Sequence, residues 1–332
     1  IMLLPNDPMD PIADGSGALT GPLAGAIVVT RDLATLQRAY ADGLGLTVRG
    51  PFVSDARAVE MQRAMWGLPA DLGYQLCVME RVRVPDAIKV LVIIPDRDTP
   101  RIRNTYAREE TGPYALGFPM KAIEQVDERM IELGFRRTLP AINRYELQLR
   151  DGRPYPINEA SYEVVDNTRL VALSRGGGLP QNGSVDPDSG VGGPAYSSLI
   201  VENVPEMEHF FTQVLDYERR TSREWSNFSP RFRYVTLHAL GARTGNLGLV
   251  EYAPADRQPA SGVPPRPPNR GLAGWSFPVR SVDVVTKRAR LHGAQIHAEP
   301  LRHEDPRFGR VIAATVMAPN GFLVEIFERV DA

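Results

Sequence analysis

The sequence predicts an α+β fold built from four βαβββ modules, each a strand, a helix and three further strands. The first observation is that a strand, an amphipathic helix and further strands recur four times along the 332 residues. The second is the Pro319-Asn320-Gly321 turn between two apolar strand-forming runs, which predicts a closing hairpin. The third is the Gly-, Pro- and Ser-rich stretch 176–194, which predicts a linker between two domains of two modules each.

Composition excludes several classes of protein. The formal net charge of −2 gives no reason to expect a nucleic acid or an anionic membrane as partner. No apolar run approaches the roughly 18 residues of a membrane span. The single cysteine, Cys77, lies in an apolar run and reads as a buried, inert thiol, and one cysteine excludes an internal disulfide. We therefore expect a cytoplasmic protein. Residues 1–21 read as an extended N-terminal arm, because they are rich in proline and acidic residues.

The first two modules are expected in residues 22–175. In module one, Asp32 caps a helix whose apolar stripe includes Leu36 and Tyr40. The strands expected in module one are 26–30, 47–49, 74–79 and 88–94. Module two has the strand 115–120, the helix 123–133 ended by Gly134, and strands 160–165 and 170–174.

The last two modules are expected in residues 195–332. Module three has the strand 198–202, the helix 205–215, and strands 217–221, 233–240 and 247–252. Module four has the strand 275–279, the helix 282–291, and the hairpin formed by 311–317 and 322–327. The Pro-rich stretch 254–268 joins the two modules. It reads as a stiff connector or as a polyproline ligand for another protein.

The last strand carries one carboxylate, Glu325, in an apolar run. An unpaired buried carboxylate is unfavourable, so Glu325 binds a cation, moves protons or points into solvent. The pattern Pro319-Asn320-Gly321-Phe322-Leu323-Val324-Glu325-Ile326 resembles the last strand of the vicinal oxygen chelate superfamily, which includes glyoxalase I, extradiol dioxygenases and bleomycin-binding proteins. The resemblance covers residues 22–330 and implies two open barrels of paired modules, each around one cavity.

The resemblance places metal ligands on the first and last strands of the modules. In residues 22–175 these positions fall on Gly25, Ala115 and Ala172, which offer no donor atoms, so this half is expected to hold no metal. In residues 195–332 they fall on Tyr196, Gly274, Glu251 and Glu325. Two carboxylates are present but the expected histidines are missing, and Thr315 stands where extradiol dioxygenases have a catalytic tyrosine. The resemblance therefore disfavours a ring-cleaving dioxygenase.

The carboxylates Glu251 and Glu325 have three interpretations. Facing one cavity, as the resemblance implies, they would act as an acid and a base. They would otherwise hold a divalent metal ion, or point outward. Among the histidines, His238 alternates with Tyr234 on a strand and reads as a cavity acid or base or as a satisfied strand residue, while His303 is expected in a solvated loop.

Aromatic and cationic residues of modules three and four complete the expected site. The candidates for shaping a cavity around a flat substrate are Tyr196, Trp225, Phe228, Tyr234 and Trp275, although most such residues are simply core. Arg233 and Arg310 are candidates, with Arg231, for holding a carboxylate or a phenolate.

Three functional hypotheses follow, and an enzyme is favoured over a binder. The first is a lyase or isomerase that uses Glu325, Glu251, His238 and Tyr196 for proton transfer on a small aromatic or carbonyl-bearing molecule. The second is a glyoxalase- or dioxygenase-like enzyme with an altered set of metal ligands. The third is a protein that sequesters a small molecule. The cofactor stays open between none and a divalent metal ion, and a homodimer is among the expected assemblies.

Overall fold

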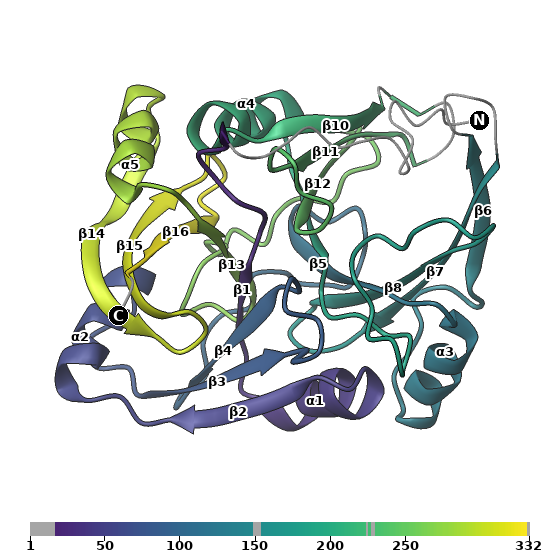
Figure 1. The fold of residues 1–332 in the computed structure, drawn as a ribbon, viewed down its shortest axis with the longest axis horizontal. Helices are drawn as coiled ribbons and strands as arrows, with labels where there is room; N and C mark the ends of the chain where they lie inside the picture. The colour runs from purple at the N-terminus through teal and green to yellow at the C-terminus, as the bar shows by residue number, and fades with distance from the viewer. Residues whose placement is uncertain (1–16, 149–153, 224, 227–229, 331–332) are drawn as a thin grey trace.

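The structure is a computed structural model, and it describes residues 17–148, 154–223, 225–226 and 230–330. Over these residues the chain forms two eight-stranded sheets with helices packed on them (Figure 1). The α+β fold and the four βαβββ modules predicted from the sequence are confirmed. None of the helices in these ranges is long and apolar enough to cross a membrane.

Each module supplies four strands. Module one contains β1 (Gly25–Val29), α1 (Leu33–Gln37) extended by a π-helical turn (Arg38–Gly43), β2 (Thr47–Phe52), α2 (Ala56–Trp66), β3 (Tyr74–Glu80) and β4 (Lys89–Pro95). Module two contains β5 (Gly112–Pro119), α3 (Ile123–Glu132), β6 (Asn143–Gln148), β7 (Pro154–Glu163) and β8 (Arg169–Arg175). Module three contains β9 (Tyr196–Ile200), α4 (Val204–Leu215), β10 (Glu218–Arg223), β11 (Phe232–His238) and β12 (Asn246–Tyr252). Module four contains β13 (Gly271–Pro278), α5 (Val282–Leu291), β14 (Gln295–Asp305), β15 (Gly309–Met317) and β16 (Leu323–Arg329).

The modules do not pair in chain order. One sheet, β14-β15-β16-β13-β1-β4-β3-β2, joins module four to module one, and we call it the outer barrel. The other sheet, β10-β11-β12-β9-β5-β8-β7-β6, joins module three to module two, and we call it the inner barrel. In Figure 1 the outer barrel lies on the left and the inner barrel on the right.

This pairing corrects the division expected from the sequence, in which 22–175 and 195–332 each formed a barrel. The stretch 176–194 connects β8 to β9 within the inner barrel and separates no sheets. The composition of residues 176–194 predicts where one module ends. It does not predict which strand of another module the next module will pair with. Of the arm 1–21, residues 1–16 lie outside the described residues. The rest runs beside module four, where the Gly21 N–H donates to the Pro278 carbonyl.

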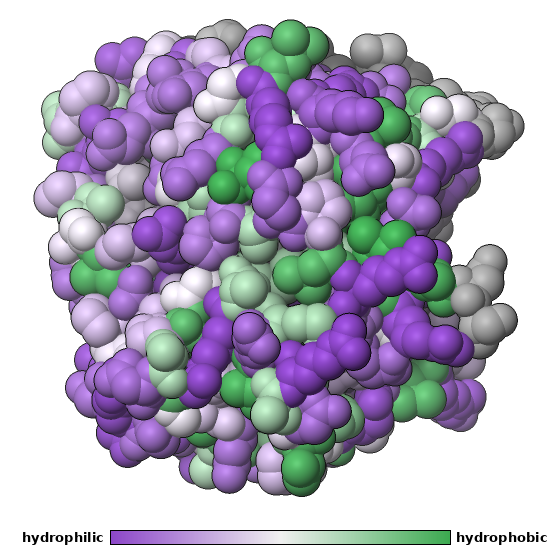
Figure 2. Space-filling model, turned by 90° about the vertical axis from the view of Figure 1, so that its left-hand side faces the viewer, coloured by the Kyte–Doolittle hydropathy of each residue, from purple (hydrophilic) through white to green (hydrophobic). Residues whose placement is uncertain are grey.

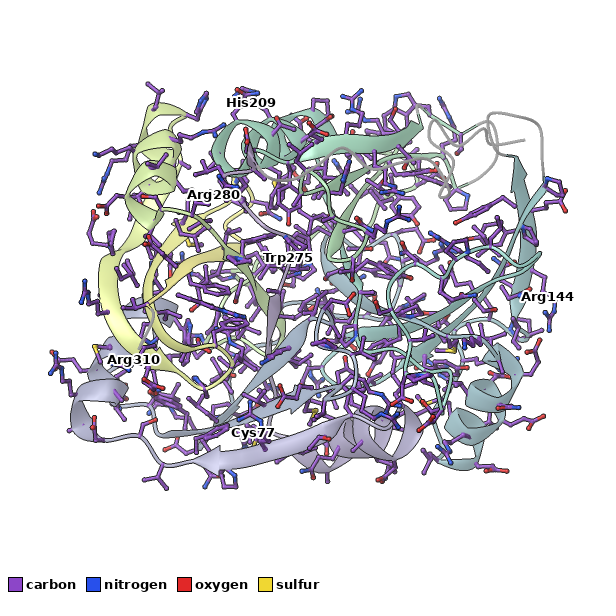
Figure 3. The ribbon with its side chains drawn as sticks, viewed as in Figure 1. Cys77, Arg144, His209, Trp275, Arg280 and Arg310 are labelled. Atoms are coloured by element: carbon purple, nitrogen blue, oxygen red, sulfur yellow. The ribbon has the colours of Figure 1, made fainter. Side chains whose placement is uncertain are left out.

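The two barrels share one apolar core. It contains residues on the helix-facing sides of both sheets, such as Leu116, Leu249 and Phe277, together with the buried faces of α1, α3, α4 and α5. Trp275 on β13 is fully buried in this core and donates from Nε1 to the Ser197 hydroxyl on β9, at 2.8 Å. Figure 3 shows Trp275 near the centre of the molecule. Trp275 is therefore a core residue, and its expected place in a substrate cavity is wrong.

The concave sides of the two sheets differ. That of the outer barrel is filled by a large apolar cluster to which α2 contributes Met65 and Trp66. The hydroxyl of Thr315 on β15 donates to the Met65 carbonyl at 2.8 Å, which ties α2 into the barrel. On the concave side of the inner barrel, the cluster formed by the described residues is small: Tyr155 and Ile157 are buried, and Leu173 and Leu179 pack against them. The concave side of the outer barrel is thus filled by its own chain, whereas the described residues leave space on the concave side of the inner barrel.

The helix α2 was not expected from the sequence, yet its ends are well marked. Asp55 caps it by accepting from the Ala58 N–H at 2.7 Å, and Gly67, with φ +66°, ends it in the left-handed conformation. Figure 2 looks at the side of the outer barrel where α2, β14 and α5 lie, and most of this face is hydrophilic with apolar residues scattered among the rest. The bulk of the apolar surface of this barrel is therefore turned inward.

Candidate functional site

The inner barrel contains a cavity of about 290 Å³ between its strands. Its apolar and aromatic walls come from Tyr155, Ile157, Leu173, Tyr196, Tyr234 and Val250. Its polar residues include Glu159, Arg175, Asn182, Arg220, Thr236 and Asn246. Apolar walls with a few converging polar groups are typical of a small-molecule site, and the volume is at the lower end of the roughly 300–1,000 Å³ seen for such pockets.

Glu159 is the one carboxylate among the described residues that line this cavity. It lies on β7, half-buried, two residues after the buried Ile157. The hydroxyl of Tyr145, on the neighbouring strand β6, donates to Oε2 of Glu159 at 3.3 Å. Glu159 was not predicted from the sequence, because the expected strand began at residue 160. The available signal was the alternation of Tyr155, Ile157 and Glu159, which places all three on one face of a strand.

Tyr196 lies on β9 with its ring over Gly117 of β5, and both residues are paired across the two strands. Burial raises the pKa of Tyr196 well above its ordinary value, and the negative charge of Glu159 raises it further. The phenol therefore stays protonated at neutral pH and acts as a hydrogen-bond donor. Tyr234, on β11, lines the same cavity. The structure thus brings together two of the residues expected from the sequence, Tyr196 and Tyr234.

Two arginines add positive charge to the cavity wall. The guanidinium of Arg175 lies over the ring of Tyr155, 5.2 Å from its centroid, and donates from Nη1 to the Pro180 carbonyl at 3.0 Å. Arg175 lies on β8 of module two, whereas Arg220 lies on β10 of module three and lines the side of the cavity that this module forms. Among the described residues that line the cavity, the charged side chains are therefore Glu159, Arg175 and Arg220. Neither arginine was predicted from the sequence to belong to the site.

Glu251 does not face this cavity. On β12 the residues Gly248 and Val250 line the cavity, so Glu251 points to the opposite side of the sheet, towards α4. There Oε2 of Glu251 accepts from the backbone N–H of Val204, the first residue of α4, at 2.8 Å. It also accepts from Nε and Nη2 of Arg233 at 2.9 and 2.7 Å. The expected catalytic role of Glu251 is therefore replaced by helix capping and an ion pair.

The other residues expected around Glu251 follow it to the helix side. The guanidinium of Arg233 lies 5.0 Å from the centroid of the Trp225 ring. Neither residue is among those that line the cavity. Phe228 lies outside the described residues. Arg310 is exposed at the start of β15, and Figure 3 shows it beside the outer barrel.

His238 ends β11 and is buried. Its Nδ1 lies 3.0 Å from the Ala239 carbonyl, and burial lowers its pKa below the ordinary value, with a smaller effect from the charge of Arg220. It follows Tyr234 and Thr236 on the same strand but is not among the residues that line the cavity. Of the two interpretations left open by the sequence, this geometry matches the satisfied strand histidine.

Glu325 lies in the outer barrel, on a different sheet from Glu251, because modules three and four do not pair with each other. It is 1% exposed. Its Oε2 accepts from the Ser276 hydroxyl at 2.6 Å and from Nη2 of Arg307 at 2.5 Å. The two carboxylates therefore share no cavity, and the expected acid–base pair of Glu251 and Glu325 is not formed.

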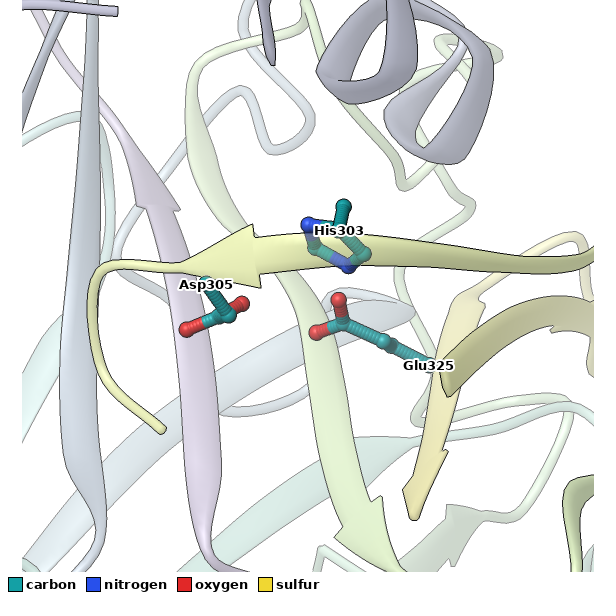
Figure 4. Close-up of side chains that lie close together, drawn as sticks. All are labelled: His303, Asp305 and Glu325. Atoms are coloured by element: carbon teal, nitrogen blue, oxygen red, sulfur yellow. The ribbon is translucent and has the colours of Figure 1, made fainter. Parts of the chain in front are cut away.

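A group of possible metal ligands does surround Glu325. Ligand atoms of His303, Asp305 and Glu325 all lie within 4.8 Å of one another (Figure 4). His303 lies on β14 and is 6% exposed, so its expected place in a solvated loop is wrong. A divalent ion does not fit this group as it stands, since Arg307 donates to both carboxylates and already supplies a positive charge there. In the inner cavity, the lining includes Glu159 but no histidine, so a nitrogen-containing metal site does not fit there either.

Comparison of the sequence finds no matching family model and no matching curated protein. Comparison of the structure finds glyoxalase I from Zea mays at 13% identity, with a TM-score of 0.58 over 92% of each chain. A mutant of the same enzyme gives 0.59 at 14% identity over 95% of each chain. A presumed dioxygenase from Bacillus subtilis gives 0.58 at 12% identity, over 95% of this chain and 87% of that chain. These likenesses show that the chain has the fold of the vicinal oxygen chelate superfamily, here with four modules paired into two eight-stranded sheets.

Proposed function

We propose that the cavity of the inner barrel is the active site of a lyase or isomerase that acts by proton transfer on a small aromatic or carbonyl-bearing molecule. The observation that carries the proposal is that a carboxylate, Glu159, and a phenol held in its protonated form, Tyr196, line one cavity with aromatic walls. The proposal keeps the chemistry expected from the sequence but moves the carboxylate from Glu325 and Glu251 to Glu159.

The cavity favours a substrate of about one ring with short substituents. Its volume of about 290 Å³ is small, and Tyr155, Tyr196 and Tyr234 offer faces for stacking. The guanidinium groups of Arg175 and Arg220 in the lining can donate hydrogen bonds to an anionic group on a substrate. An aromatic keto acid combines these features.

In the proposed reaction, the carboxylate of Glu159 takes a proton from the carbon next to a carbonyl group. The electron pair of the broken C–H bond moves into the carbonyl, and the hydroxyl of Tyr196 donates a hydrogen bond to the oxygen that becomes negative. In a substrate whose enolate is conjugated with a second C=C bond, return of the proton from Glu159 to the far carbon of that bond moves the double bond and gives an isomer. Departure of a leaving group from the β-carbon gives an alkene, which completes a lyase reaction. Neither route needs a redox partner.

A second candidate is a protein that binds a small molecule in the same cavity without reaction. The aromatic lining and the arginines support binding in either case. The metal-dependent alternative is less well supported, because Arg307 fills the donor group of the outer barrel and the inner cavity lining contains no histidine.

Proton exchange distinguishes an enzyme from a binder. Phenylpyruvate, an aromatic keto acid with acidic C3 protons, and related aryl ketones are incubated with the protein in D2O, and exchange of the acidic protons is followed by NMR. We expect protein-dependent exchange that falls by about a hundredfold or more in Glu159→Gln, the scale for a positioned acid or base. Glu163→Gln is the matched control, because Glu163 lies further along β7 and pairs with Arg136 instead. Probes that bind equally to wild type and Glu159→Gln, with no exchange in either, would identify a binder.

A further inference from the structure

The outer barrel holds a buried cation of its own, the side chain of Arg307. This side chain is fully buried, and each of its three nitrogens donates a hydrogen bond. Nε donates to Oδ1 of Asp305 at 3.1 Å, and Nη1 donates to the Ser276 hydroxyl at 2.7 Å. Nη2 donates to Oδ2 of Asp305 at 2.7 Å and to Oε2 of Glu325 at 2.5 Å. Such charge-assisted bonds are about twice as strong as neutral ones.

The guanidinium lies beside the first-strand residue Gly25. A Cβ atom on Gly25 would lie 2.9 Å from Nη1 of Arg307, so a larger residue there would collide with the guanidinium. Gly25 on β1 and Glu325 on β16 therefore both lie next to the same buried cation. The guanidinium also lies 4.8 Å from the centroid of the Phe308 ring, which in turn stacks on Phe327.

The single positive charge of Arg307 is surrounded by more than one acidic side chain. Asp305 and Glu325 are 2% and 1% exposed, so two buried carboxylates face one guanidinium. His303 is 94% buried, and neither of its ring nitrogens has a hydrogen-bond partner among the described residues. An unpartnered imidazole whose ligand atom lies within 4.8 Å of two carboxylates is an unused ligand for a cation.

We propose that Arg307 is a built-in replacement for a metal ion, and that its guanidinium blocks a divalent-metal site formed by His303, Asp305 and Glu325. One imidazole and two carboxylates, with Ser276 beside them, form a donor set that suits Co²⁺, Zn²⁺ or Ni²⁺. The guanidinium takes up the negative charge that would attract such an ion. The inference concerns the outer barrel and is independent of the function proposed for the inner cavity.

Removal of the guanidinium tests this directly. Arg307→Ala and, as a second variant, Arg307→Ser are purified without metal and titrated with Co²⁺, whose visible absorption reports its ligands. We expect one equivalent of Co²⁺ to bind each variant and to raise its Tm by on the order of 5 °C, because a ligand of the folded state stabilises it. Wild type under the same conditions should show neither the absorption nor the shift in Tm.

Two double variants establish which donors bind. Adding His303→Ala or Glu325→Gln to Arg307→Ala should abolish binding of Co²⁺. If Arg307→Ala and Arg307→Ser are unfolded without metal, folding on addition of Co²⁺ becomes the readout. Variants that neither bind Co²⁺ nor fold with it would overturn the proposal. So would wild-type protein that binds one equivalent of Co²⁺ and loses it in the single variant Glu325→Gln.

Discussion

The ring of Tyr196 occupies the space where Gly117 lacks a side chain. A Cβ atom on Gly117 would lie 1.9 Å from Cζ of that ring, far inside van der Waals contact. Gly117 is not among the glycines with a positive φ, so its role is to make room rather than to allow an unusual turn. The position of a proposed hydrogen-bond donor therefore depends on the absence of one methyl group on the neighbouring strand.

Gly117→Ala is expected to displace Tyr196 and reshape the inner cavity. Overpacking of this kind costs about 1–3 kcal/mol in the free energy of unfolding, and binding of phenylpyruvate or of another retained probe should weaken by about tenfold or more. The two quantities are measured by denaturant unfolding and by NMR titration. Gly17→Ala is the control, since a Cβ atom there would meet nothing within 4 Å. Unchanged binding in Gly117→Ala would mean that Tyr196 does not contact the ligand.

Glu251→Gln should lower stability while leaving proton exchange in the inner cavity intact. The change removes the charge that pairs with Arg233 and accepts from the N-terminus of α4, so we expect the free energy of unfolding to fall by about 1–3 kcal/mol. Denaturant unfolding and the exchange assay are run on the same preparation. If Glu251→Gln remains folded and loses as much proton exchange as Glu159→Gln, then Glu251 does take part in the reaction and this assignment is wrong.

Thr315→Val should loosen the packing of α2 in the outer barrel. The variant keeps the shape of the side chain but leaves the Met65 carbonyl without its donor, which costs about 1–3 kcal/mol for a buried group. Denaturant unfolding measures the loss, and hydrogen exchange of the amides of α2 should show faster opening. Thr315→Ser retains the hydroxyl and should retain most of the protection. Equal protection in all three proteins would show that the bond does not hold the helix.

His238→Gln should change the dependence of stability on pH. Burial lowers the pKa of His238 in the folded state below its ordinary value of about 6.5. The unfolded chain therefore binds the proton first, and stability is lost as pH falls from about 6.5 through the lower folded pKa. In His238→Gln this loss is absent, so the difference in the free energy of unfolding between the two proteins should vary with pH only in that window. A constant difference would show that His238 is not held in its neutral form.

The modules could be predicted from the sequence because their signals are local. In the closing hairpin, the Gly321 N–H donates to the Ala318 carbonyl with φ +78° at Gly321, as the turn sequence indicates. Which modules pair is not a local property, because β1 and β5 are both short apolar first strands and either could meet either partner. That single choice decided whether Glu325 and Glu251 would share a barrel.

The site was harder to predict because it depends on which face of a strand each residue takes. A shift of one residue turns a side chain from the cavity to the helices, and the sequence placed Glu251 on the wrong side of β12. The role of Arg307 was not predicted, because the sequence alone does not distinguish a buried arginine from a solvated arginine in a loop rich in charged residues. A homodimer and a cytoplasmic location stay predictions.

The nested pairing of the modules also sets an order of events during synthesis. The inner barrel consists of consecutive modules and has all its strands once residue 252 has left the ribosome. Module one, although made first, has no partner for the edge of β1 until β13 follows more than two hundred residues later. The nascent chain must therefore keep the open edge of the apolar strand β1 from aggregating through most of its synthesis. A chain that stops before residue 271 should complete only the barrel that holds the proposed active site.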